Sequence, residues 1–240
     1  MLYNSFSFLL FFPIVAIFFF VLPHRVQQWY LLLVSYLFYM NWNPTYALFL
    51  GFVTLVTYYG TKQIVSKTDK KRTDRGGVTV ILLFTFAGLF VFKYLNFINE
   101  TIWRVLASIG CRMEVPHLDL LLPVGISFYT FQACGYVIDV YKGNVEPEKK
   151  LGYYALFLAF FPQIAAGPIG RAKELLPQFK EKHYPDVNNI TRGLRWMLWG
   201  YFMKVVVADR LALYTDAVFG NIAHHTGVSV LVAAMLFTFQ

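Results

Sequence analysis

The sequence predicts an all-α protein, a bundle of transmembrane helices that crosses the bilayer about six to eight times. Hydrophobic residues make up 58% of the 240 positions and aromatic residues 19%, whereas charged residues make up only 14%. Soluble domains carry about 25% charged residues, so the composition indicates a protein that lies in lipid. A helix needs roughly 20 apolar residues to cross the hydrocarbon core, and long apolar segments follow one another along this chain.

Eight apolar segments are candidate spans. They are residues 5–22, 29–40, 46–59, 78–98, 120–136, 151–166, 193–208 and 228–240. The second and third are short and flank the polar residues 41–44, so they form either two tilted helices or one kinked helix. In the fifth, we expect Asp119 to cap the helix start and Pro123 to occupy its first turn.

The last apolar segment, residues 228–240, reaches the end of the sequence. A segment of this length, at about 1.5 Å per residue, covers only some two-thirds of a ~30 Å core. We therefore expect residues 1–240 to be the amino-terminal part of a single longer domain. A short or re-entrant terminal helix is the alternative.

The formal charge of +8 is concentrated between the spans. The most basic connection contains Lys62, Lys67, Lys70, Lys71, Arg72 and Arg75. Basic residues collect on cytoplasmic loops, which explains this charge without a nucleic-acid partner. If three spans precede the loop, the amino terminus lies outside the cytoplasm; if two precede it, the orientation is reversed.

The segment FFPQIAAGPIGR, residues 160–171, interrupts the sixth apolar segment with two prolines and two glycines. Proline removes a backbone donor and clashes with the preceding turn, so a straight helix breaks here. Broken backbone at membrane depth persists only where protein buries it or where it lines a cavity. The sequence therefore predicts an internal cavity, unless Pro168 merely ends a span and Arg171 extends to the headgroups.

Seven polar or helix-breaking residues are the candidates for the cavity lining. They are Ser127, Gln132, Gln163, Gly167, Pro168, Arg171 and Lys204. Polar side chains inside membrane helices usually bond to neighbouring helices or to backbone carbonyls, so a structural role is the alternative for Ser127 and Gln132.

Arg192, Arg195 and Trp199 recur at three- and four-residue spacing and so share one helical face. This pattern is typical of an amphipathic helix that lies at the membrane interface, with tryptophan at headgroup depth. Lys204 follows within an apolar run, so we expect it to face protein or water, unless its side chain extends to the headgroups from near the end of the span. Asp209 lies about 140° around a straight helix from Lys204, so the two form a poor pair.

The remaining reactive residue types give no recognisable site. Cys111 and Cys134 have neither a disulfide framework nor metal-ligand spacing, and the five histidines lie in polar connections without a companion set. We expect no bound metal or cofactor.

Three long blocks together resemble the membrane-bound O-acyltransferases, in their alginate O-acetyltransferase branch. These blocks are LLPVGISFYTFQACGYVIDVYKG at residues 121–143, FFPQIAAGPIGRAKELLPQF at 160–179 and GLRWMLWGYFMKVVVADRLA at 193–212. Shorter similarities are YLFYMNW at 36–42 and FKYLNF at 92–97. The similarity keeps its order along essentially the whole chain.

The resemblance implies a multi-pass enzyme of the bacterial cytoplasmic membrane whose helices ring a cavity within the bilayer. Such enzymes take an acyl group from a thioester, acetyl-CoA or a carrier-bound donor, and pass it toward a cell-surface polysaccharide, commonly with a partner protein outside the membrane. The family's catalytic histidine lies beyond the position of Gln240. No catalytic residue is therefore carried onto this sequence, and the chain as given is expected to be inactive.

Two other classes of function remain open on the sequence. A transporter also uses broken helices, but it predicts a weak inverted repeat and acidic residues inside spans, and neither is visible. A non-catalytic membrane subunit predicts that a complete enzyme is encoded elsewhere.

Overall fold

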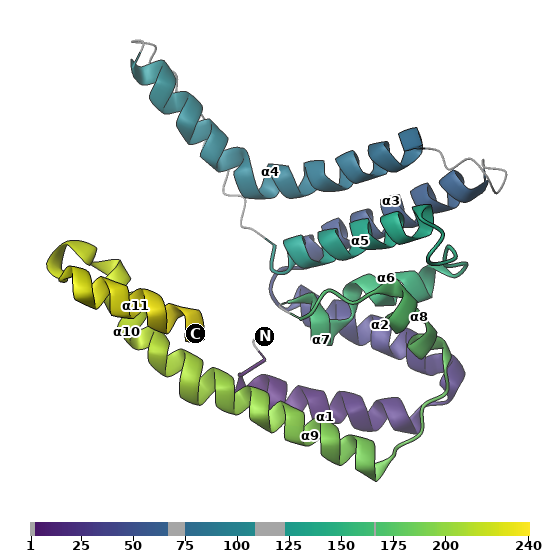
Figure 1. The fold of residues 1–240 in the computed structure, drawn as a ribbon. Helices are drawn as coiled ribbons and strands as arrows, with labels where there is room; N and C mark the ends of the chain where they lie inside the picture. Colours follow the sequence, from purple (N-terminus) through teal and green to yellow (C-terminus); the bar gives the residue numbers. More distant parts are fainter. Residues whose placement is uncertain (1–2, 67–74, 109–122, 166) are drawn as a thin grey trace. The chain divides into compact units, whose positions relative to one another are not determined.

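The computed structural model describes residues 3–66, 75–108, 123–165 and 167–240. All regular structure in these ranges is helical (Figure 1), which confirms the predicted all-α class. The elements in chain order are α1 (Phe6–Val21), α2 (His24–Met40), α3 (Pro44–Ser66), α4 (Arg75–Ser108), α5 (Ile126–Tyr141), α6 (Leu151–Ala159), α7 (Phe161–Ile164), α8 (Ala172–Lys180), α9 (Val187–Tyr201), the π-helix η1 (Phe202–Ala208), α10 (Asp209–Gly220), the 3₁₀ turn η2 (Ile222–His224) and α11 (Gly227–Phe239).

Within the described ranges, one helix is long and apolar enough to cross a membrane. This segment is Arg75–Leu106 of α4, whose most apolar 18-residue window has a mean hydropathy of 2.1. Shorter apolar helical segments are Phe6–Val21, Leu151–Ile164 and Gly227–Phe239. The predicted six to eight spans therefore stay a prediction, although the described parts of the apolar segments are largely helical.

The structure selects one of the two alternatives left open at residues 41–44 and corrects one predicted helix start. Met40 ends α2 and Pro44 begins α3, so these segments are two helices rather than one kinked helix. The predicted start of the fifth helix is wrong: α5 begins at Ile126, after Pro123. Its N-cap is Gly125, in a left-handed conformation, while Asp119 lies outside the described residues.

The chain divides into two compact units. Unit 1 comprises Ile17–Lys182, and unit 2 comprises Leu2–Ala16 and His183–Gln240. In unit 1, α3 packs against α2, α4, α5 and α6, and α6 in turn contacts α2, α5 and α8. Unit 1 also contains the contacts of α6 with α7 and of α2 with both of them, where the prolines interrupt the chain.

Buried tyrosines form the centre of unit 1. Tyr154 is fully buried, donates a hydrogen bond to Thr57 Oγ1 at 2.7 Å, and its ring centre lies 4.5 Å from that of Tyr136. The Tyr58 hydroxyl donates to the carbonyl of Lys149 at 2.6 Å. A buried hydroxyl without a partner would be unfavourable, so these bonds allow tyrosine in the apolar interior.

Glu148 anchors the connection between α5 and α6 to α8. Its Oε2 lies 2.5 Å from Lys180 Nζ, and its Oε1 accepts a hydrogen bond from the amide of Lys150 at 3.0 Å. The amide of Glu148 donates to the hydroxyl of Tyr136 at 2.8 Å. Glu148 is itself buried, so its charge is compensated by a lysine that remains half exposed.

In unit 2, α9, η1 and α10 follow one another without a break, and α11 packs on α10. Figure 1 shows α9 to α10 as one continuous helical rod. Thr215 on α10 donates to Gln240 Oε1 at 2.8 Å, and Tyr201 donates to the carbonyl of Tyr3 at 2.6 Å.

Candidate functional site

The chain breaks between α6 and α7, at the position that the prolines predicted. Phe160 has φ −53° and ψ 108°, outside the helical region, and separates the two helices. In an uninterrupted helix the amide of Phe161 would donate to the carbonyl of Phe157, four residues earlier. Pro162 lies in the first turn of α7, where a missing amide hydrogen is tolerated.

Two side chains from other helices replace that missing backbone bond. Ser35 Oγ on α2 accepts from the amide of Phe161 at 3.2 Å. Gln132 Nε2 on α5 donates to the carbonyl of Phe157 at 2.9 Å. All four residues are buried. Helices α2 and α5 therefore satisfy the broken backbone inside the protein, as a membrane environment requires.

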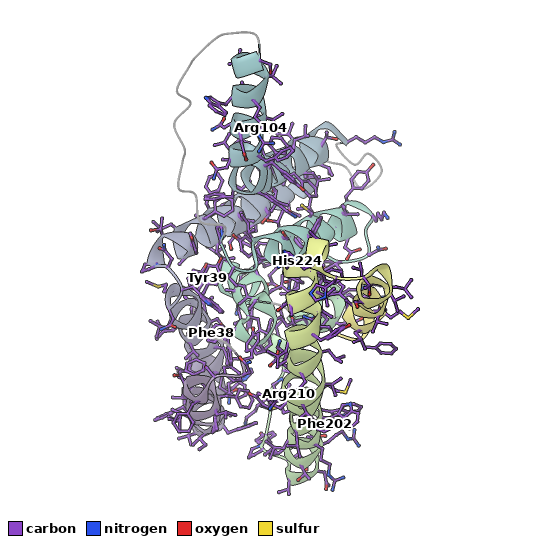
Figure 2. All side chains as sticks on the ribbon, turned by 90° about the vertical axis from the view of Figure 1, so that its left-hand side faces the viewer. Phe38, Tyr39, Arg104, Phe202, Arg210 and His224 are labelled. Carbon is purple, nitrogen blue, oxygen red and sulfur yellow. The ribbon has the colours of Figure 1, made fainter. Side chains whose placement is uncertain are left out.

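Two aromatic side chains of α2 also pack near the break between α6 and α7. Phe38 and Tyr39 are labelled on α2 in Figure 2. The Phe38 ring centre lies 5.6 Å from that of Phe161, and the Tyr39 hydroxyl donates to the carbonyl of Val124 at 3.0 Å. This bond holds the residues before α5 against α2.

Gly125 brings the start of α5 into backbone contact with α7. Its φ is +75°, a conformation that side chains strongly disfavour. A Cβ at this position would lie 2.0 Å from the carbonyl oxygen of Ile164. Only glycine allows this approach, so the sequence PVGIS and the sequence FFPQI meet at one point.

The segment that follows α7 stays in close contact with Gln163. The amide of Gly167 donates to the carbonyl of Gln163 at 2.9 Å. A Cβ on Gly170 would lie 2.8 Å from Gln163 Oε1 and 3.5 Å from Gln132 Nε2. Gln163, Gly170 and Gln132 thus form one polar cluster at the break, which we call the Gln163 cluster.

One polar atom of the Gln163 cluster is buried and has no hydrogen-bond partner among the described residues. This atom is Gln163 Oε1. Buried polar atoms in proteins are usually paired with protein or with ordered water. The cluster therefore holds an acceptor, Gln163 Oε1, that is suited to a donor from water or from a bound hydroxyl.

The other predicted lining residues are arranged differently. Ser127 lies partly buried in the first turn of α5, Gly167 is partly buried, and Pro168 is exposed. Arg171 is exposed at the N-cap of α8, where its side chain makes no capping bond. Within the described part of the chain, the prolines and glycines define the break, and Gln132 and Gln163 supply its polar groups.

Lys204 belongs to unit 2, and the predicted absence of a pair with Asp209 is wrong. Lys204 Nζ lies 2.5 Å from Asp209 Oδ1. The two residues are joined by η1, where the amide of Asp209 donates to the carbonyl of Lys204. A π-helix bonds residue i to residue i+5, so residues five apart are stacked here rather than offset.

Sequence reasoning missed Ser35, Tyr39 and Gly125. Ser35 is the only serine or threonine within the apolar segment 29–40, and that isolation was its only signal. Among the described residues there is no group of three or more histidine, cysteine or acidic side chains that could hold a metal ion. The predicted lack of a metal or cofactor stays a prediction, and His117 and Cys111 lie outside the described residues.

The chain is similar over its whole length to curated acetyltransferases. It is 32% identical over 241 residues to the probable alginate O-acetylase AlgI of Pseudomonas aeruginosa, and 35% identical over 246 residues to that of Pseudomonas putida. These matches cover 100% of this chain and 46% and 49% of the relatives. The peptidoglycan O-acetyltransferase of Helicobacter pylori is 30% identical over 241 residues, which are 88% of this chain and 44% of that protein.

The chain thus spans about half the length of the curated relatives it matches. A teichoic acid D-alanyltransferase of Streptococcus thermophilus matches a shorter part, with 32% identity over 93 residues, 38% of this chain and 22% of that protein. No protein-family model matches, and no solved structure matches significantly. The whole-length matches include both units and the break with its Gln163 cluster.

Proposed function

Since the chain is a homologue of bacterial O-acetyltransferases of the membrane-bound O-acyltransferase type, we propose that it is the amino-terminal part of such an enzyme. The complete protein passes an acetyl or other acyl group from a thioester donor toward a cell-surface polysaccharide of the alginate kind. It lies in the bacterial cytoplasmic membrane as a multi-pass protein, and a partner outside the membrane relays or receives the acyl group. The observation that carries the proposal is the whole-length similarity to proteins named for this activity.

Acyl transfer from a thioester requires a dry site with preorganised polar groups. Attack on the thioester carbonyl develops negative charge on its oxygen, which aligned donors stabilise. A general base removes the proton from the attacking hydroxyl. In the resemblance that base is a histidine beyond Gln240, so we assign no catalytic base within this chain.

The Gln163 cluster supplies a different part of such a site. Gln163 Oε1 is an acceptor without a donor among the described residues, and Gly170 packs so closely against it that an added Cβ would lie 2.8 Å away. An acceptor of this kind holds the hydroxyl hydrogen of an incoming alcohol and so orients its oxygen. In this proposal Gln163 positions the attacking hydroxyl, while Ser35 and Gln132 hold the backbone that carries it.

A variant of the intact enzyme tests the assignment. We expect Gln163→Leu to lower acetylation of the polysaccharide by about tenfold or more, because it removes a hydrogen bond that orients a reacting group. The matched control is Gln178→Leu, which removes an exposed amide on α8 that donates to the carbonyl of Glu174. Both variants are compared at equal amounts of membrane protein. Unchanged acetylation in Gln163→Leu would refute the role of the cluster.

A further inference from the structure

Helix α9 is an exposed helix with an unbalanced charge. None of its residues is buried, and between Val187 and Tyr201 it contains arginines but no acidic residue. The nearest carboxylate along the sequence, Asp186, is used at the N-cap, where it accepts from the amide of Asn188 at 3.1 Å. The positive charge of α9 is therefore not compensated within the helix.

Four side chains gather on one face of α9, at positions i, i+3, i+4 and i+7. They are Arg192, Arg195, Trp196 and Trp199, and we call them the Arg/Trp face. Together they line an open hollow on the surface of this helix. Phe202 stacks on Trp199 with ring centres 5.5 Å apart and extends the aromatic wall.

The two guanidinium groups are available to a ligand. Neither Arg192 nor Arg195 has a salt bridge with any described residue, in contrast to Arg104 of α4, which pairs with Glu100 at 2.6 Å. Trp196 and Trp199 are 69% and 56% exposed. The hollow thus presents unpaired guanidinium donors beside open indole rings.

This combination is matched to one class of ligand. A guanidinium group offers donors in a fixed fork that fits the oxygens of a phosphate. Tryptophan favours the depth of lipid headgroups, where its ring is apolar and its N–H is wet. Anionic lipids attract exposed arginines at a membrane surface. We propose that the Arg/Trp face binds the phosphodiester headgroup of an anionic phospholipid, with both arginines on the phosphate and both tryptophans beside the upper acyl chain.

The proposal is independent of acyl transfer, so its test does not use enzyme activity. The full 240-residue chain, in a neutral detergent, is titrated with dihexanoyl phosphatidylglycerol, and binding is followed by calorimetry. Dihexanoyl phosphatidylcholine is the zwitterionic comparison, and inorganic phosphate is the soluble one. We expect phosphatidylglycerol to bind at least about tenfold more tightly than phosphatidylcholine, and inorganic phosphate not to displace it at equal concentration.

Variants separate a built site from general charge attraction. We expect Arg192→Gln with Arg195→Gln to weaken binding about 25-fold, since each basic residue near an anionic surface contributes about fivefold. Arg192→Lys with Arg195→Lys keeps the charge but removes the fork, and we expect an intermediate loss. Arg104→Gln is the control, because its guanidinium is already paired (Figure 2 marks its place on α4). The helix content of each variant is measured by circular dichroism.

Several results would overturn the proposal. Equal binding of both lipids, or unchanged binding in the double glutamine variant, would show that the face does not select anionic headgroups. Full affinity in the lysine variant, or an equal loss in Arg104→Gln, would reduce the effect to net charge. Displacement by inorganic phosphate would assign the hollow to a soluble phosphate. A dimer that the glutamine variant abolishes would assign it to a protein contact.

Discussion

Replacing Gln132 by leucine tests whether a side chain really replaces the missing backbone bond at the break. Gln132 Nε2 is the donor to the carbonyl of Phe157, at 2.9 Å, and both residues are buried. Leucine has a similar size but no donor, so the carbonyl is left unpaired. An unsatisfied buried acceptor costs about 1–3 kcal/mol. Leucine itself is easier to bury than an amide, so we expect a net loss of about 1–2 kcal/mol in the free energy of unfolding.

The assay is unfolding of the detergent-solubilised chain by sodium dodecyl sulfate, followed by far-ultraviolet circular dichroism. Gln178→Leu is the matched control, because Gln178 also donates to a backbone carbonyl, at 3.0 Å, but does so on the exposed surface of α8. We expect this control to stay within about 0.5 kcal/mol of the wild type. If Gln132→Leu is as stable as the wild type, the carbonyl of Phe157 needs no protein donor, and the account of the break given above fails.

Two further substitutions test the packing around the site by the same unfolding assay. Gly125→Ala should lose about 2 kcal/mol or more, because alanine disfavours a φ of +75° and its Cβ would overlap the carbonyl of Ile164. Gly135→Ala is its control within α5 and should be neutral or slightly stabilising, since nothing lies within 4 Å of the added Cβ; equal losses in both would contradict the backbone contact. Glu148→Gln should lose about 1 kcal/mol, because the buried carboxylate pairs with Lys180, whose half exposure screens the attraction. An unchanged midpoint would mean that this ion pair does not hold α8.

The sequence predicted the helical class and the place of the break because both follow from local chemistry. Proline at position 162 and the high apolar content act on the chain without any knowledge of its neighbours. The spacing of Arg192, Arg195 and Trp199 likewise predicted one shared face, and the hollow on α9 confirms it. Periodicity within a helix is a property of a few adjacent turns.

Two errors came from assuming regular helix geometry. The pairing of Lys204 with Asp209 depends on the π-helical backbone of η1, which places residues five apart above each other. The start of α5 at Ile126 depends on Gly125, which adopts a left-handed conformation and lies so close to Ile164 that a Cβ would overlap its carbonyl. In both cases the prediction holds for a straight α-helix, but the folded chain has a different backbone conformation at that point.

The sequence alone determined that this chain is helical and apolar, and that it breaks where prolines remove backbone donors. It did not determine which groups would take the freed amide and carbonyl, because those partners are far away along the chain. Ser35 precedes Phe161 by 126 positions, and Gln132 precedes Phe157 by 25. Only the packing of α2 and α5 against α6 and α7 brings them within hydrogen-bond distance. The physical reason is that a buried polar group must be paired, and that requirement is met by tertiary neighbours, which no local pattern encodes.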